Sequence, residues 1–305
     1  MVLTNGRARP TFQWIDRGEV SETSPADLIP NRPLERQINM LSQLSGASRL
    51  FPIIGDPVEY AQSPVNLTRT FAERGHNGLC VPLQVQDGDL DVVMAGLTAS
   101  LNVDGILVTM PHKFTAFAFC TSSSERARLL GVVSVIRRNP DRTCHGDMLD
   151  GLAFVKAQQD RGAEIDGARA LLVGAGGAGS AIAIALLDAG VRDLVIHDAE
   201  QARVDALLGL LAGIADRRAT AGPADPAGCD LVFNASPMGM ADDDPLPVDG
   251  ALLTSSMFVG DVIAGHGVTP FVAAAHTAGC RTADGGHMVE AVQELMFDFM
   301  LGNER

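Results

Sequence analysis

Basic residues, long apolar runs, paired cysteines and clustered histidines are all scarce in this sequence. Lysine and arginine together number 23, against 37 aspartates and glutamates, which gives a net charge of −14 at pH 7. A chain with this charge is repelled by nucleic acid and by anionic membrane surfaces. We therefore expect no nucleic-acid partner and no membrane partner, and a small molecule is the better expectation for a ligand.

No run of apolar residues approaches the length of a membrane span, and the polar start lacks the apolar core of a secretory signal. The five cysteines are scattered without a CxxC pair, and the seven histidines form neither HExxH nor HxH. These absences predict a cytoplasmic protein with reduced thiols and without a metal site.

The organisation of the chain is typical of α/β proteins. Its 305 residues, 46% of them hydrophobic, suit two globular domains. Residues 1–45 carry prolines among polar residues and predict an extended arm. Farther along, aliphatic strands alternate with helix-like segments, as in parallel sheets covered by helices. Strands are predicted over residues 50–54, 79–83, 104–109, 132–137, 169–173, 193–197, 230–234 and 258–262. Helices are predicted over residues 64–74, 88–99, 177–189, 200–214 and 270–278.

The most specific short motif lies in the run ALLVGAGGAGSAIAIALLDAG. An aliphatic strand leads into Gly174, Gly176 and Gly179, and a helix of small and aliphatic residues follows. These glycines permit a tight turn, a close approach of pyrophosphate to the backbone and close packing of helix on strand. Gly177 and Ala178 complete the loop, and the N–H groups of the helix start suit an anion. The motif predicts dinucleotide binding.

Two further strand ends belong to the same predicted site. Asp198 ends the next strand, at about the 20-residue distance where a carboxylate receives the ribose hydroxyls. Because a carboxylate repels a 2′-phosphate and Arg203 is expected to face solvent, NAD is predicted over NADP. A helix cap at Asp198 would leave the choice of cofactor open. The stretch CDLVFNASPMGM then places Asn234, Ser236 and Met238 along the crevice, although its composition is also that of an ordinary turn.

A lysine in an apolar stretch, GILVTMPHKFTAFAF, is the first candidate for chemistry. A strand ends at Thr109, Pro111 suits the first helical position, and Lys113 should then lie in the first turn. The positive end of a helix dipole disfavours a cation, which makes the amine a better proton acceptor. The alternative is that Lys113 extends into water. Farther back, Ser63 suits an N-cap before Pro64, and its hydroxyl also suits a carboxylate.

Six blocks, "IIGDPVEYAQSPVNLTRTF", "DGILVTMPHK", "GDMLDG", "GAGGAG", "NASPMGM" and "DGGHM", occur in an order and spacing that resemble the shikimate dehydrogenase family. The resemblance implies reversible hydride transfer between NAD(P) and a cyclic hydroxy acid such as shikimate or quinate. It implies that Lys113 and Asp150 are the catalytic pair, with Asp150 mainly orienting the substrate and the lysine. An N-cap role for Asp150, in competition with Asp147, is the alternative.

The resemblance also implies the fold. Two α/β domains are expected, an N-terminal substrate-binding domain with a mixed sheet and a C-terminal Rossmann domain. The expected boundaries are an extension over residues 1–45, a catalytic domain over 46–150, a Rossmann domain over 151–282 and a C-terminal helix over 283–305 that packs back on the first domain. Apart from the resemblance, the polar segment KAQQDRGAEIDGAR precedes a fresh aliphatic strand, so a hinge is expected near residues 151–168. A homodimer is compatible with this plan.

Several positions depart from the family's pattern. Apolar residues stand where the family has polar substrate contacts, at Ala61, Leu107, Val135, Met148 and Val292. Each lost partner removes about 0.5–1.5 kcal/mol of hydrogen bonding. Ser63, Thr109, Ser134 and Gln293 remain as predicted substrate contacts, and His112 and His287 are further candidates. The chain is thus expected to act on shikimate, quinate or a less hydroxylated cyclic acid. A non-catalytic NAD(P) sensor and a folate-ring dehydrogenase are the rival hypotheses.

Overall fold

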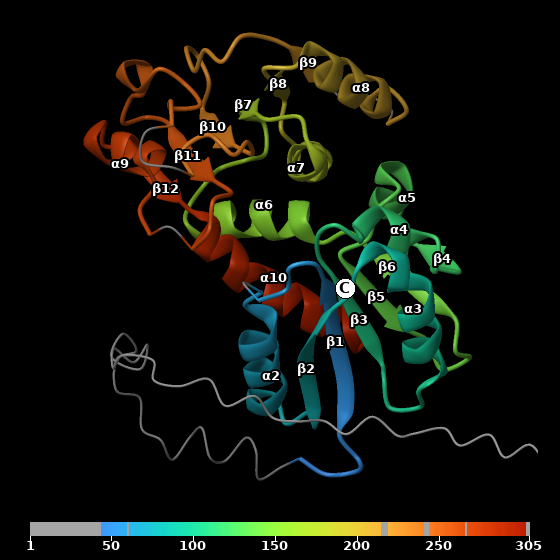
Figure 1. The fold of residues 1–305 in the computed structure, drawn as a ribbon. Coiled ribbons are helices and arrows are strands. Elements are labelled where there is room, and N and C mark those ends of the chain that lie inside the picture. Colours follow the sequence, from blue (N-terminus) through green and yellow to red (C-terminus); the bar gives the residue numbers. More distant parts are fainter. Residues whose placement is uncertain (1–43, 60, 215–218, 241–243, 266, 303–305) are drawn as a thin grey trace, which may run out of the picture. The chain divides into compact units, whose positions relative to one another are not determined.

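The computed structural model of the chain describes residues 44–59, 61–214, 219–240, 244–265 and 267–302. Nearly all of the predicted arm over residues 1–45 therefore lies outside the described residues. Within them the chain forms two six-stranded sheets with helices packed around them (Figure 1). No described helix is both long and apolar enough to cross a membrane.

The first sheet is mixed, as predicted, with the strand order β2-β1-β3-β5-β6-β4. Its strands are β1 (Arg49–Gly55), β2 (Gly78–Gln84), β3 (Gly105–Val108), β4 (Ser122–Ser123), β5 (Val135–Arg138) and β6 (Cys144–Asp147). Strand β1 is parallel to β2 and β3, whereas β5 is antiparallel to both β3 and β6. The consecutive buried residues of β1 and β3 are expected for strands covered on both faces.

The second sheet is parallel throughout, with the order β12-β11-β10-β7-β8-β9. Its strands are β7 (Arg169–Val173), β8 (Asp193–His197), β9 (Ala219–Ala221), β10 (Leu231–Asn234), β11 (Phe258–Asp261) and β12 (Arg281–Ala283). The chain moves outward from β7 in one direction and then returns to β10 on its other side. A doubly wound sheet binds its ligand at the carboxyl ends of strands at such a switch point.

Nine α-helices occur among the described residues. They are α2 (Ser63–Glu73), α3 (Leu90–Ala99), α4 (Lys113–Phe117), α5 (Glu125–Leu130), α6 (Asp150–Asp160), α7 (Gly177–Asp188), α8 (Gln201–Leu211), α9 (Pro270–Thr277) and α10 (Gly285–Met300). Short 3₁₀ turns lie at η2 (Asp87–Asp89) and η3 (Gly250–Leu252). Helices α6 and α10 lie side by side, and α10 also packs against α2 and β5 (Figure 1). Helix α6 occupies the first part of the predicted hinge, up to Asp160.

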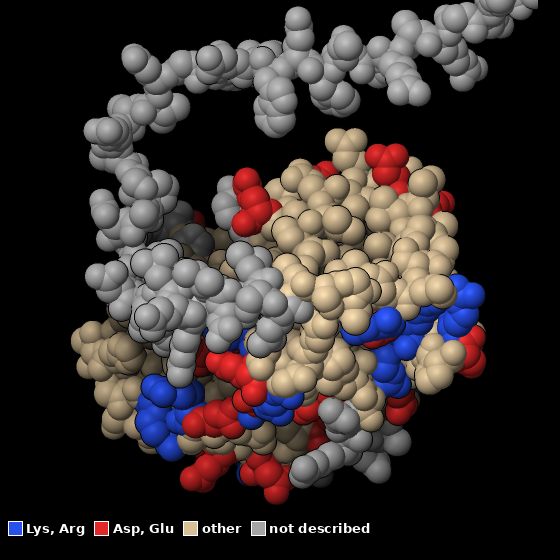
Figure 2. Space-filling model, turned by 90° about the horizontal axis from the view of Figure 1, so that it is seen from below, with Lys and Arg blue, Asp and Glu red and all other residues tan. Residues whose placement is uncertain are grey.

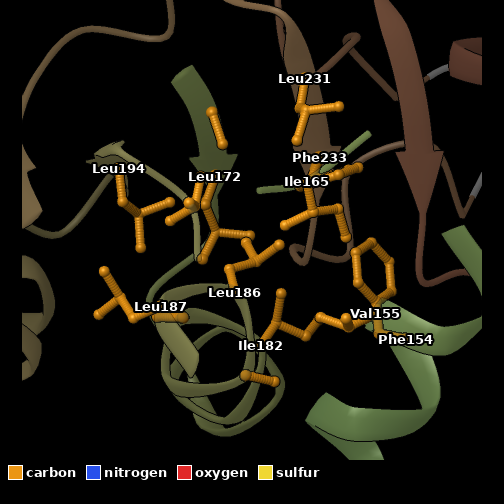
Figure 3. Packing of buried hydrophobic residues seen from close by; sticks show 14 of the residues in the cluster. Phe154, Val155, Ile165, Leu172, Ile182, Leu186, Leu187, Leu194, Leu231 and Phe233 are labelled. Atoms are coloured by element: carbon orange, nitrogen blue, oxygen red, sulfur yellow. The ribbon is translucent and has the colours of Figure 1, made fainter. Parts of the chain in front are cut away.

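The largest apolar cluster joins α6 and α7 to the second sheet (Figure 3). Phe154 of α6 meets Phe233 of β10 edge to face, with ring centroids 5.2 Å apart. Ile182 and Leu186 of α7 fill the same cluster. Helix α6 is thus packed on the second sheet, although its first residue carries a side chain that reaches the first half of the chain.

All five cysteines have free thiols, and all but Cys120 are buried. Burial raises the pKa of the Cys80 thiol to about 12, and partial burial together with the neighbouring Cys144 raises that of Cys120 to about 12. On the face shown in Figure 2, basic side chains lie beside acidic ones. The pair between Arg49 and Asp104 is one such contact in the described structure. The absence of a nucleic-acid partner stays a prediction.

Four of the strands were not predicted from the sequence, namely β4, β6, β9 and β12. They are two to four residues long, and only a neighbouring strand makes them extended. The antiparallel pairing of the predicted mixed sheet involves β5 and β6. They form a hairpin, because "NPDR" between them makes a tight turn in which Arg142 has a φ of 72°.

Candidate active site

Lys113 is the first residue of α4, which follows the buried strand β3. The prediction that Pro111 opens the helix is wrong, because the chain first makes a turn in which the His112 N–H donates to the Thr109 carbonyl at 3.0 Å. His112 is the N-cap residue, and its buried ring lies with Nε2 2.6 Å from the Val85 carbonyl oxygen. The start of the helix is thereby anchored to the loop after β2.

The ammonium of Lys113 forms an ion pair with the carboxylate of Asp150. The two side chains are 23% and 19% exposed, so each keeps some access to solvent or to a ligand. Helix α4 has only five residues. For the Lys113 ammonium, the attraction of the Asp150 carboxylate in direct contact is therefore stronger than the repulsion by the dipole of so short a helix. The alternative in which Lys113 simply extends into water is wrong.

Asp150 is the first residue of α6, and the residue before it, Leu149, is the N-cap. The alternative N-cap role of Asp150 is wrong, since its side chain reaches Lys113 and no side chain caps this helix. The Leu149 N–H donates to the buried Ser134 hydroxyl at 2.9 Å. Ser134, a predicted substrate contact, thus supports the backbone just before Asp150. Asp147 does not cap α6 either, because its carboxylate binds the N-cap serine and an arginine of α5.

Ser63 and Gln293 come together although they are far apart in the sequence. The prediction that Ser63 is the N-cap is wrong by one residue, because Gln62 is the N-cap and Ser63 begins α2. The Gln293 Nε2, on α10, donates to the Ser63 Oγ at 3.5 Å. Gln293 is 6% exposed and Ser63 is 9% exposed. The Gln293 Oε1 has no hydrogen-bond partner among the described residues, so it is left to accept one.

The other predicted substrate positions lie around these two groups. Thr109 follows β3 directly, is half-buried, and donates its N–H to the Ile54 carbonyl at 2.9 Å. His287 is not free, since it completes the N-terminal capping box of α10 with Asp284. The apolar replacements pack into hydrophobic clusters of the first sheet, with Ala61, Leu107, Val135 and Val292 in one cluster and Met148 in the next.

The glycine-rich loop joins β7 to α7 at the switch point of the second sheet. Gly174 has a φ of 108°, and a Cβ there would lie 2.6 Å from the Ala235 carbonyl carbon. A Cβ at Gly179 would lie 1.9 Å from the Gly174 oxygen. These two glycines are required by the fold itself, because backbone atoms occupy the space that any side chain would need.

Gly176 and Gly177 differ from them, because apart from the adjoining residues and the backbone of the helix itself no described protein atom lies within 4 Å of the place a Cβ would take. Gly176 is the N-cap of α7, with Gly177 and Ala178 as its first residues, and neither a side-chain cap nor an acidic residue blocks this end. Open space in front of free helix N–H groups fits the pyrophosphate of a dinucleotide. A nicotinamide dinucleotide held by the N–H groups at the start of α7 would supply the centre that gives or takes the hydride.

Asp198 lies just after β8 and binds the glycine-rich loop. One carboxylate oxygen accepts from the Ala175 N–H at 2.8 Å, and the other accepts from the Glu200 N–H at 2.9 Å. The simple helix-cap alternative is wrong, because Glu200 is the N-cap of α8. A carboxylate has about four acceptor positions, so two remain for ribose hydroxyls. Arg203 is exposed and pairs with Glu200, as expected for a solvent-facing residue.

Asn234 organises the loop after β10. Its amide group donates to the Met238 carbonyl at 3.1 Å and to the Asp261 carboxylate at 3.0 Å. Its oxygen accepts from the Ser236 N–H at 3.0 Å and from the Ser236 hydroxyl at 2.6 Å. Ser236 in turn accepts from the Met238 N–H at 3.2 Å. The Asn234 side chain is thus fully used in shaping the loop beside Gly174.

Asp261 and Thr269 belong to the same network and were not predicted. The buried Asp261 carboxylate also accepts from the Thr269 hydroxyl at 2.7 Å and from the Ile263 N–H at 3.1 Å. Burial raises the pKa of Asp261, and these hydrogen bonds oppose the rise. The sequence could have indicated Asp261, because it lies near the end of a predicted strand just as Asn234 ends the neighbouring one.

A second unused signal concerns Lys113. The chain has only two lysines, Lys113 and Lys156, among its 23 lysines and arginines. Arginine serves wherever a permanent positive charge is enough, but it cannot give up a proton in a protein. Lys113 is therefore one of two basic side chains of this kind that can still give up a proton, and the other, Lys156, is ion-paired with Asp160.

Known proteins are similar to this chain in sequence and in fold. The substrate-binding domain of shikimate dehydrogenase matches residues 53–136. Among solved structures, shikimate 5-dehydrogenase from Listeria monocytogenes, in complex with shikimate and NAD, has a TM-score of 0.80 and 24% identity, covering 86% of this chain and 94% of that one. Quinate dehydrogenase from Corynebacterium glutamicum, in complex with NAD, has a TM-score of 0.76 and 26% identity, covering 84% and 94%.

Sequence relatives are similar over most of their length. The shikimate dehydrogenase (NADP(+)) of Rubrobacter xylanophilus is 36% identical over 81% of this chain and 88% of its own. That of Moorella thermoacetica is 32% identical over 86% and 91%. The predicted resemblance and the predicted two-domain α/β fold are confirmed. The chain is an NAD(P)-dependent oxidoreductase that acts on a CH–OH group, and it belongs to the shikimate dehydrogenase family.

Proposed function

We propose that the protein transfers a hydride between a nicotinamide dinucleotide and a ring hydroxyl or ketone of shikimate, quinate or a related cyclic hydroxy acid. The observation that carries the proposal is the ion pair between Lys113 and Asp150. Asp150 begins α6, which packs against α7, the helix that follows the GxGxxG loop. The names of the sequence relatives and of the quinate dehydrogenase with similar structure support the substrate class.

The roles of the pair follow from the chemistry. Oxidation of an alcohol requires a base on the hydroxyl while the hydride leaves carbon, and reduction of the ketone requires an acid on the same oxygen. Lys113 exchanges that proton through its Nζ. Asp150 holds the amine in place and accepts a hydrogen bond from a substrate hydroxyl. A bound nicotinamide serves as the hydride partner.

The remaining contacts favour a substrate with fewer polar groups than shikimate. We assign Ser63 and Gln293 to one polar group of the ligand, with Thr109 and Ser134 closer to the catalytic pair. The surrounding cluster with Ala61, Leu107, Val135 and Val292 is apolar. A substrate hydroxyl facing these residues would be buried without a partner, at a cost of about 1–3 kcal/mol. Shikimate turnover is therefore expected to be slower than turnover of a less hydroxylated analogue.

The catalytic role of Lys113 is tested by the change Lys113→Met. Initial rates are measured at 340 nm with NAD and NADP and a panel of shikimate, quinate and less hydroxylated cyclic acids. Loss of the proton donor should lower kcat by roughly 10²- to 10⁴-fold. The matched control is Lys156→Met, which removes the other lysine, also ion-paired, with Asp160 at 2.8 Å.

Equal activity of Lys113→Met and wild type on an accepted substrate would overturn the catalytic assignment. Calorimetry with both cofactors completes the experiment. Cofactor binding without turnover of any panel member would favour the rival hypothesis of a non-catalytic sensor.

For the cofactor, we propose a preference for NAD. Asp198 and Glu200 flank Ala199 just after β8, so these three residues offer no positive charge to a 2′-phosphate. The sequence relatives are named as NADP(+) enzymes, so the preference would be a departure from them.

The change Asp198→Asn with Ala199→Arg tests this preference. Asparagine can still accept from the Ala175 N–H, while the repulsive charge is lost and an arginine becomes available for the phosphate. The ratio of kcat/KM for NADP to that for NAD should rise about ten- to a hundredfold. Arg203→Ala is the control and should leave the ratio unchanged. An unchanged ratio in the double variant would show that Asp198 does not face the ribose.

The domain boundaries, the homodimer and the cytoplasmic location remain predictions. Size-exclusion chromatography with light scattering decides the oligomeric state directly.

A further inference from the structure

Gly151 follows Asp150 in α6 and touches the helix that begins at the glycine-rich loop. A Cβ at Gly151 would lie 2.1 Å from the carbonyl oxygen of Ala181 in α7, and 2.5 Å from its carbonyl carbon. Both are backbone atoms, which cannot rotate away as a flexible side chain can. The backbone of Gly151 is helical rather than left-handed, so glycine is required here for space alone.

The contact lies between two parts of the proposed site. The side chain of Asp150 pairs with Lys113, and the next residue rests on α7 a single turn beyond its first residue, Gly177. Two anchors keep α6 from sliding along this contact. The Leu149 N–H binds the Ser134 hydroxyl at 2.9 Å, and Phe154 packs on the second sheet (Figure 3).

We propose that Gly151 is a positioning residue for hydride transfer. Because it lacks a Cβ, α6 and α7 meet backbone to backbone, and this fixes the position of Asp150, and through its ion pair that of the Lys113 amine, relative to the helix end assigned to the cofactor. The inference rests on the proposed function of these residues. A displacement of about 1 Å in such a site lowers rates by up to roughly 100-fold.

The first test is Gly151→Ala, measured with whichever substrate the wild type accepts. The expected result is a fall in kcat of roughly tenfold or more, with KM and the cofactor dissociation constant within about threefold of wild type. Rates are normalised to folded sites by titration with cofactor. The matched control is Gly96→Ala in α3, where no described atom lies within 4 Å of the new Cβ. Unchanged kcat per folded site in Gly151→Ala would overturn the inference.

A double-mutant cycle shows whether Gly151 acts through Asp150. Asp150→Asn is combined with Gly151→Ala, and the double variant should have the kcat of Asp150→Asn alone. Independent, multiplicative losses would show that Gly151 has only a structural role. Ala181→Val enters the same cycle from the α7 side, because Ala181 is buried against residues of the first sheet. It carries the test if Gly151→Ala does not fold.

A third measurement needs no turnover, so it remains decisive if the proposed function fails. Reductive methylation with ¹³C-formaldehyde labels both lysines, and Lys156→Arg assigns their NMR signals. Asp150→Asn should shift the Lys113 signal, and Gly151→Ala or Ala181→Val should shift it in the same direction. A Lys113 signal that moves in Asp150→Asn but in neither of the other variants would contradict the proposal. Lack of turnover by wild type on every substrate would overturn the proposed function alone.

Discussion

At the scale of single residues, His76 shows how burial couples stability to pH. Its ring packs on Phe71 and Phe51, with centroids 5.2 and 5.9 Å apart, and its Nε2 has no partner among the described residues. Burial lowers the pKa of His76 from its ordinary value of 6.5; Asp104 opposes this shift and Arg49 adds to it. The folded protein therefore binds the His76 proton less tightly than the unfolded chain does.

The sign of the pH effect follows. Well above pH 6.5 the histidine is neutral in both states. As the pH is lowered through 6.5 the unfolded chain takes up the proton first, so the stability decreases as the pH decreases. We expect the urea midpoint of wild type to fall between pH 8 and pH 5, and His76→Phe, which keeps a ring but cannot be charged, to show a smaller fall. Equal falls in the two proteins would contradict this account.

At the scale of elements, α6 contains an amide that the fold does not satisfy. Gln158 is fully buried, and neither its Nε2 nor its Oε1 has a hydrogen-bond partner among the described residues. Its side chain lies over Gly260 of β11, where a Cβ would come within 2.2 Å of the Gln158 oxygen. An unpaired buried polar group costs about 1–3 kcal/mol.

Gln158→Met keeps the volume and removes this cost, so the free energy of unfolding should rise by about 1–3 kcal/mol in urea titrations. The adjacent Gln159 is exposed on the same helix, and Gln159→Met should change stability by less than about 0.5 kcal/mol. A decrease in Gln158→Met would mean that an internal water satisfies the amide.

The elements themselves differ in how far the sequence predicts them. Strands such as β7 and β10 are aliphatic runs bounded by polar residues and turns, and they lie within a residue of their predicted limits. Strand β6 reads "CHGD" and became predictable only through its pairing with β5. The first residues of α2 and α4 were misplaced by one or two positions, because turns before a helix depend on tertiary hydrogen bonds such as that of His112.

At the scale of the whole molecule, the sequence predicted groups of residues better than it predicted their contacts. The glycine-rich loop is local, and its spacing was enough to place it at the start of α7. Gln293 and Ser63 are separated by 230 positions, and no periodicity within α10 shows which of its faces meets α2. The unequal use of Gly176 and Gly151, one beside open space and one against a backbone, likewise required the tertiary structure.

The position of α6 has a consequence for how such proteins can be recombined. Its first side chain pairs with a lysine of the preceding half of the chain, while its body is packed into the following half. A chimaera joined before residue 150 would inherit the carboxylate from one parent and the lysine from the other, and one joined after α6 would mismatch the α6–α7 seam. The two halves of the chain are therefore not interchangeable as separate units, because α6 makes contacts in both.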